Sequence, residues 1–165
     1  MPSSFRTSSV CSPSRGAGRR IEAGVAEARD GKPSTRAGRR FARPAKEAEV
    51  VGVATLKGKE ILIAATGEGR AILCKADEIN YLSGPGKGVI LIKLGAEDRV
   101  IGFIASTGDR DLLTVETSRG AEQTISTTKY EITGRGGKGR ELLQRGRFTR
   151  VIWPPPEAPP LLGGS

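Results

Sequence analysis

Arg135-Gly136-Gly137-Lys138-Gly139 lies 51 residues after Gly84-Pro85-Gly86-Lys87-Gly88, and the two stretches share their last three residues. When this register is extended without a gap, residues 61–102 overlay residues 112–153, and 11 of the 42 aligned positions are identical. The identities include glycines, a lysine and an Arg-Val-Ile run near the end of each unit. A period of this length is typical of propellers, solenoids and arrays. The sequence therefore predicts two tandem structural units.

A third, partial copy precedes these two units. Val50-Val51-Gly52-Val53 resembles Val100-Ile101-Gly102-Phe103, and each run follows a pair of acidic residues. The second unit ends in Trp153-Pro154-Pro155-Pro156, after which prolines are frequent and favour an extended chain. We therefore expect a basic leader (1–46), a repeat remnant (47–57), two complete blades (58–107 and 108–153) and a proline-rich tail (154–165).

Within the units, short runs of β-branched and apolar residues alternate with turn residues. About four such runs fall in each period, which matches the number of strands in a propeller blade. An all-β fold of propeller-like blades is therefore expected. Its predicted strands are Glu49–Thr55, Glu60–Thr66, Gly69–Lys75, Val89–Leu94, Arg99–Ser106, Leu112–Thr117, Ala121–Ser126, Glu141–Gln144 and Phe148–Trp153.

The leader, residues 1–46, differs from the repeats in composition. It is rich in Ser, Arg, Gly and Pro, and its apolar residues are scattered, which predicts disorder. Ile21–Arg29 favours a short helix, but an isolated helix of that length is marginal in water. Three roles stay open: a solvated basic tail, a nucleic-acid-binding arm, or an organelle transit peptide, since the first 20 residues contain Arg but no acidic residue.

Charge is unevenly distributed along the chain, whose formal net charge is +9. The leader carries 11 Lys or Arg against 3 Asp or Glu, residues 47–133 carry 10 against 13, and residues 134–150 carry 6 against 1. A basic total favours a polyanionic partner. The basic charge of the repeats is thus concentrated around the second glycine turn.

Several classes of function are excluded by residues that the sequence lacks. There is no His, and Cys11 and Cys74 are too few for a disulfide framework, so a zinc site is not expected and a reducing compartment fits. Without His the usual general base of nucleophilic catalysis is missing as well. No apolar run has the length of a membrane span, and no secretory signal is recognisable.

The glycine turns suggest an anion site. Glycine permits positive φ, so such a turn can expose backbone N–H groups, and the neighbouring Arg and Lys add positive charge. A phosphate is the ligand that suits this combination. The simpler alternative is a hairpin turn with a solvated lysine. A nucleotide P-loop is disfavoured, because Gly88 and Gly139 stand where that motif requires Ser or Thr.

The order of these features resembles a known family. Strand Ile61–Thr66, the first glycine turn, Val89-Ile90-Leu91-Ile92-Lys93-Leu94 and Asp98-Arg99-Val100-Ile101-Gly102 together resemble the C-terminal repeat of the A subunit of bacterial DNA gyrase and topoisomerase IV. Thr133-Gly134-Arg135-Gly136-Gly137-Lys138-Gly139 is similar to the gyrase A-subunit box, although that box normally opens with Gln-Arg-Arg. The choice between gyrase and topoisomerase IV stays open.

The resemblance implies a β-pinwheel, a propeller-like disc whose basic rim bends and wraps duplex DNA. It implies phosphate contacts for Arg135, Lys138 and Arg140, with Lys87 as a weaker match in the first unit. Such contacts position DNA without reading its sequence. The candidate DNA-binding set also contains the other residues of the turn and two further basic residues: Gly136, Gly137, Gly139, Arg145 and Arg147.

The tyrosine domain that cleaves DNA in this family is not recognisable here. Tyr81 and Tyr130 lie just before the glycine turns and are interpreted as half-buried aromatics at strand ends. We therefore expect no catalysis and no cofactor for this chain alone, since Mg²⁺ and ATP belong to the full complex. The expected partners are double-stranded DNA and the remaining topoisomerase A and B subunits, in the cytoplasm with the nucleoid, without membrane or small-molecule substrate.

Two other functions stay open. One is a stand-alone basic β-domain that binds RNA, with the leader as an arm, and the other is a structural repeat module that binds protein. Two blades and a remnant cannot close a disc, so exposed sheet edges are expected. One hypothesis that follows is that the chain is a truncated or frameshifted gene product.

Overall fold

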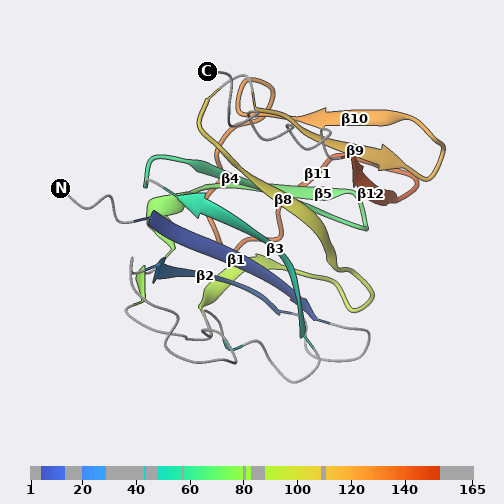
Figure 1. The fold of residues 1–165 in the computed structure, drawn as a ribbon. Coiled ribbons are helices and arrows are strands. Elements are labelled where there is room, and N and C mark those ends of the chain that lie inside the picture. Colours follow the sequence, from blue (N-terminus) through green and yellow to red (C-terminus); the bar gives the residue numbers. More distant parts are fainter. Residues whose placement is uncertain are drawn as a thin grey trace, which may run out of the picture.

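The computed structural model describes residues 5–13, 20–28, 43, 48–56, 58–79, 81–82, 88–108 and 111–152. These residues form three sheets that lie one above another, as Figure 1 shows. The middle sheet consists of strands from both repeats. The candidate site lies along one edge of this sheet, so the pairing of the strands there fixes the positions of the site residues.

The middle sheet has the order β11-β5-β4-β8. β4 (Ile61–Thr66) pairs antiparallel with β5 (Arg70–Lys75) and with β8 (Val100–Ser106), all from the first repeat. β11 (Arg140–Glu141) comes from the second repeat and pairs with the outer edge of β5. Each repeat therefore adds a strand to the sheet of the repeat before it.

The first sheet follows the same plan. Its strands lie in the order β3-β1-β2, and β2 also pairs with β6 and with β7, which come from the first repeat. β7 thus completes the first sheet as β11 completes the middle one. The bounds are β1 (Phe5–Pro13), β2 (Arg20–Ala28), β3 (Ala48–Leu56), β6 (Tyr81–Leu82) and β7 (Val89–Lys93).

The third sheet is the smallest, with the order β10-β9-β12. Its strands are β9 (Leu113–Thr117), β10 (Glu122–Ile125) and β12 (Phe148–Ile152). By the pattern of the other two sheets a further strand would pair with β10. Among the described residues β10 pairs only with β9.

The middle sheet is buried on both faces, which explains why its strands are continuously apolar. Successive side chains of a strand point to opposite faces. Leu62 and Ala64 accordingly belong to the core shared with the first sheet, whereas Ile63 and Ala65 belong to the core shared with the third. Phe103 packs so closely against β3 that a Cβ on Gly52 would lie 3.0 Å from its ring.

The third sheet is apolar only on the face that meets the middle sheet. Leu113, Val115 and Ile125 fill the shared core. At the positions equivalent to Ile63, Ala65, Ala71 and Leu73, the other face carries Thr114, Glu116, Glu122 and Thr124. A polar outer face is what a terminal repeat needs in order to meet water. The stack of apolar sheets therefore ends at the third sheet.

The all-β prediction is confirmed, and eight of the nine predicted strands agree with the structure to within one residue at each end. Shifts of this size are common at strand ends. The predicted strand Glu141–Gln144 is wrong beyond Glu141, since β11 covers only Arg140–Glu141, and β6 was not predicted. A three-residue 3₁₀ helix, η1 (Ala76–Glu78), occupies the connection after β5. The proline-rich tail, 154–165, lies outside the described residues.

The leader differs from its predicted disorder in two places. β1 and β2 lie inside residues 1–46, and the segment that favoured a short helix is strand β2 instead. The physical reason is that β1 pairs with β3 and β2 with β7, and these strand edges offer backbone partners that composition does not reveal. The rest of the leader, except Arg43, is outside the described residues.

The buried thiol of Cys74 gives a test of this core. Burial, reinforced by the charge of Glu78, raises the pKa of Cys74 from 9.0 to about 12. Between these two pH values the thiol stays protonated in the folded state but ionises in the unfolded chain. This contribution to stability is complete below pH 9 and is lost as the pH rises toward 12. Between pH 9 and pH 12, the free energy of unfolding measured by urea denaturation should fall by about 1.4 kcal/mol per pH unit.

The Cys74→Ala variant is the control for this prediction. It removes the titrating group, so the additional loss of stability between pH 9 and pH 12 should disappear, although the variant is less stable overall. An identical pH dependence in both proteins would mean that Cys74 is accessible to water in the native state.

Candidate nucleic-acid interface

The glycine turn at residues 134–139 is hydrogen-bonded into the sheets of the preceding repeat. The amides of Thr133 and Gly134 donate to the carbonyl of Leu73, at 2.9 and 3.1 Å. The amide of Gly136 donates to Leu91 at 2.7 Å, and the carbonyl of Gly137 accepts from Lys93 at 2.8 Å. The turn therefore bridges β5 of the middle sheet and β7 of the first sheet.

This arrangement narrows the predicted phosphate cradle to the end of the turn, where the amides of Gly137, Lys138 and Gly139 have no acceptor among the described residues. The amide of Arg135 donates to the Glu78 carboxylate at 3.2 Å, so four consecutive amides, 133–136, already have acceptors inside the protein. A backbone N–H group that donates to a carbonyl is not available to a phosphate. The alternative of a plain hairpin turn is equally inapplicable, because the turn joins no hairpin and instead fastens one repeat to another.

Glycine is required at the end of the turn for two reasons. Gly139 has φ +73°, and its equivalent in the first unit, Gly88, has φ +81°, in the region that side chains rarely adopt. A Cβ at Gly139 would also lie 2.7 Å from the carbonyl oxygen of Ala71 and 2.9 Å from Ile92 Cδ1. The absence of a side chain at Gly139 thus allows the turn to pack directly against the backbone of Ala71 in β5.

Arg135 is held by the 3₁₀ helix after β5. Its guanidinium Nε donates to the backbone carbonyl of Glu78 at 2.7 Å, and its own amide donates to the carboxylate of the same residue. The side chain remains exposed to solvent. Arg135 is therefore a cation with a defined position at the junction of two repeats.

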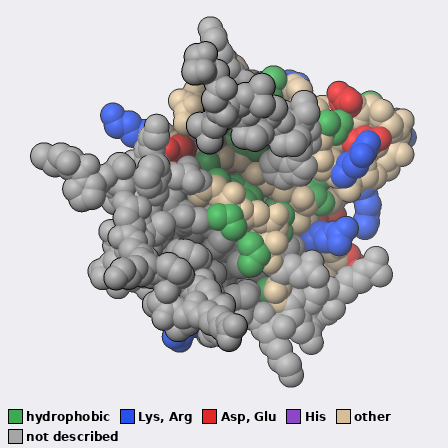
Figure 2. Space-filling model, in the orientation of Figure 1, with side chains coloured by type: hydrophobic (Ala, Val, Ile, Leu, Met, Phe, Trp, Pro, Cys, Tyr) green, Lys and Arg blue, Asp and Glu red, His purple; other side chains and the backbone are tan. Residues whose placement is uncertain are grey.

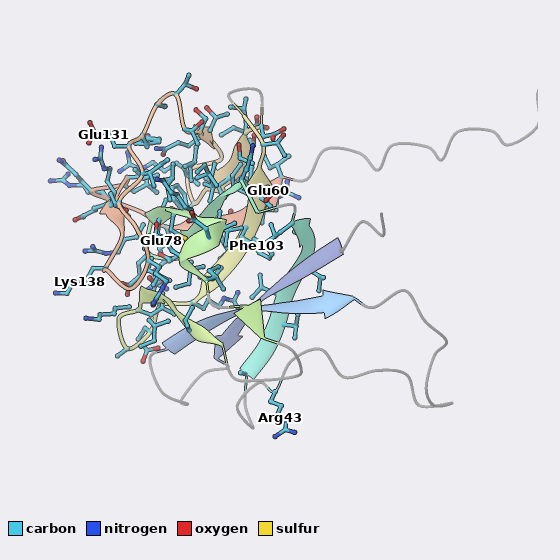
Figure 3. The ribbon with its side chains drawn as sticks, turned by 90° about the vertical axis from the view of Figure 1, so that its left-hand side faces the viewer. Arg43, Glu60, Glu78, Phe103, Glu131 and Lys138 are labelled. Atoms are coloured by element: carbon cyan, nitrogen blue, oxygen red, sulfur yellow. The ribbon has the colours of Figure 1, made fainter. Side chains whose placement is uncertain are left out.

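The other two cations predicted to contact DNA are also exposed. Arg140 lies on β11 and forms a loose ion pair with Glu131, 3.9 Å apart. Lys138 extends from the turn away from the body of the protein, on the same side as Glu131 (Figure 3). The structure thus brings Arg135, Lys138 and Arg140 together on one short segment.

The remaining predicted site residues are less uniform. Arg145 and Arg147 are exposed, and the backbone of Arg147 bonds to Ser118 through its amide and its carbonyl. Lys87 lies outside the described residues. Arg150, which the prediction did not include, pairs with Glu116. On the face shown in Figure 2, basic and acidic side chains lie close to one another.

Tyr130 fits its interpretation as a half-buried aromatic. It packs against the core shared by the middle and third sheets, and its hydroxyl accepts a hydrogen bond from Gln123 Nε2 at 3.3 Å. Lys129 Nζ lies 5.6 Å from the centre of its ring. The side chain of Tyr81 is outside what the structure describes.

Within the described part of the chain, no group of three or more His, Cys, Asp or Glu residues is arranged to hold a metal ion. The same residues contain no helix that is both long and apolar enough to cross a membrane.

Sequence reasoning missed Glu78, whose carboxylate and carbonyl both contact the turn. The polar connection that contains it gave no indication of a role. One signal was present in the repeat itself, since the equivalent position in the second unit is Lys129, a reversal of charge.

Comparison with known proteins places this geometry in a family context. Residues 60–107 match the family described as DNA gyrase C-terminal domain, beta-propeller. A search of curated protein sequences returned no match.

Three solved structures are similar in fold. The C-terminal domain of DNA topoisomerase IV has a TM-score of 0.74 and 16% identity, covering 92% of this chain and 46% of that one. The DNA gyrase A C-terminal domain has a TM-score of 0.68 and 16% identity, covering 92% of this chain and 49% of that one. The C-terminal domain of E. coli ParC has a TM-score of 0.53 and 13% identity, covering 89% of this chain and 78% of that one. The chain thus spans about half the length of the first two domains.

The glycines of the turn yield a matched pair of variants. Gly139→Ala should destabilise the protein by about 1–3 kcal/mol, because its φ is positive and the new methyl group would collide with the backbone of Ala71. Gly137→Ala should shift stability by less than about 1 kcal/mol, since Gly137 is not among the glycines with positive φ and its nearest neighbour, Gly139 N, is 3.9 Å away. Thermal unfolding measures both, and equal effects would contradict the close packing of the turn.

Proposed function

We propose that this chain binds duplex DNA through its phosphates, because its fold is similar to the C-terminal domains of DNA topoisomerase IV and DNA gyrase A and residues 60–107 match the gyrase C-terminal domain family. The observation that carries the proposal is the cluster of Arg135, Lys138 and Arg140 on a turn whose backbone is fixed by hydrogen bonds. Side chains supply the phosphate contacts in the first half of the turn, since amides 133–136 already donate to acceptors within the protein. Binding of this kind is insensitive to base sequence and weakens steeply with salt.

Position of the cations matters as much as their number. Arg135 and Arg140 are attached to the middle sheet, one through Glu78 and the other through strand pairing with Ala71. A rigid set of charges binds a phosphate chain without the entropy loss of ordering flexible side chains. Rigid contacts at successive repeats also hold DNA in a curved path, which offsets the elastic cost of bending it.

Wrapping, rather than cleavage, is the activity we assign to this domain. Its expected setting is the cytoplasm, together with the other parts of a topoisomerase A subunit and with the B subunit. Those parts would supply the strand cleavage and the ATP- and Mg²⁺-dependent steps. This chain would hold the bound DNA in a curved path.

A triple variant tests the assigned contacts. Arg135→Ala, Lys138→Ala and Arg140→Ala together remove up to three phosphate contacts, so the slope of log affinity against log salt should flatten by about two to three units. The matched control replaces Lys59, Arg99 and Arg119, three exposed basic residues outside segment 134–150, with Ala. An equal flattening in the control would show that only net charge matters.

The type of nucleic acid gives a second test. We expect the chain to prefer duplex DNA over a structured RNA of equal length in gel-shift titrations, because a curved rim of phosphate contacts suits a long bendable duplex. Similar affinity for two unrelated DNA sequences should accompany this preference. Clear preference for RNA would replace the proposal with an RNA-binding function.

A further inference from the structure

Glu78 makes three hydrogen bonds, two with Arg135 of the glycine turn and one with Lys75 at the end of β5. One carboxylate oxygen accepts from the amide of Arg135 at 3.2 Å, and the other accepts from the amide of Lys75 at 3.1 Å. Its backbone carbonyl accepts from the Arg135 guanidinium at 2.7 Å. One acidic residue of the first repeat thus joins the end of β5, η1 and the basic turn of the second repeat.

The fit around this carboxylate is close. Gly134 has φ +82°, and a Cβ there would lie 3.1 Å from Glu78 Oε2. The turn therefore approaches the carboxylate at a position where it carries no side chain. In Figure 3, Glu78 lies inward of Lys138, between the outer turn and the sheets. In this view the acid lies nearer the sheets than Lys138 does.

We propose that Glu78 is a positioning residue for DNA binding: it fixes Arg135 at the junction of two repeats so that the guanidinium faces the phosphate chain. The proposal rests on the proposed function and adds a residue that does not touch DNA. A carboxylate close to a phosphate-binding site repels DNA, so its presence lowers affinity unless the order that it imposes on Arg135 outweighs the repulsion.

Positioning and simple charge therefore predict opposite results for Glu78→Ala. If Glu78 orders the turn, its loss frees the amides of Arg135 and Lys75, so the backbone that carries Arg135 is no longer fixed even though the carbonyl of residue 78 remains. The salt slope of duplex binding should then fall by about one unit, the value of one phosphate contact. If Glu78 acts only as a negative charge, its loss should raise affinity and leave the slope unchanged.

Glu131→Ala is the matched control, because it removes the same charge beside the same turn. The Glu131 side chain is 91% exposed and pairs only loosely with Arg140. We expect affinity equal to or higher than that of the unchanged protein, with no loss of slope. Glu78→Gln serves as a second variant, since its single carbonyl oxygen can accept one of the two amide bonds, and its slope should be intermediate.

The experiment measures binding of the full chain to a duplex DNA fragment across a salt series, together with amide exchange of Arg135 and Lys75. Faster exchange and a reduced slope in Glu78→Ala, but not in Glu131→Ala, support the proposal. Equal behaviour of the two variants overturns it. Absence of salt-dependent DNA binding in the unchanged protein refutes the proposed function instead, and amide exchange then decides alone whether Glu78 orders the turn.

Discussion

The hydrogen bonds between the glycine turn and the preceding repeat are the interaction on which this structure depends. They join the carbonyls of Leu73 and Leu91 to amides that lie about 60 and 45 residues further along the chain. Because the turn reaches back, each repeat completes a sheet begun by its predecessor. The repeats are therefore interlocked units, and the basic residues of one are fixed by the backbone of another.

This interlocking links stability to function at a single place. Backbone groups on the inner side of the turn satisfy the edges of β5 and β7, while the side chains on its outer side remain in solvent. Glycine makes the division possible, since Gly139 brings the chain within contact distance of Ala71. The same geometry that closes the sheet edge thus displays Arg135 and Lys138 at the surface.

Much of the fold could be predicted from the sequence, because a gapless repeat carries both strand positions and turns. The apolar run Ile61–Thr66 also indicates a strand buried on both faces. Strands β1 and β2 could not be predicted, since their pairing depends on distant edges rather than on their own composition.

The sequence names the basic side chains of the candidate site but not the hydrogen bonds of its backbone. A glycine-rich sequence indicates that positive φ is available, yet it does not say whether the amides face a ligand or a neighbouring strand. That choice depends on Leu73, Leu91 and Glu78, which are remote in sequence from the turn. The role of Glu78 is likewise a property of the assembled repeats.

The central claim is that amides 133–136 of the turn are bonded within the protein and that the side chains of the turn bind the phosphates. Hydrogen exchange of the Gly134 and Gly136 amides, with and without a duplex DNA fragment, tests it most directly. Both amides should exchange as slowly as those of β5 in the free protein, and their exchange should change little when DNA is added. Rapid exchange in the free protein, with protection appearing only when DNA binds, would contradict it.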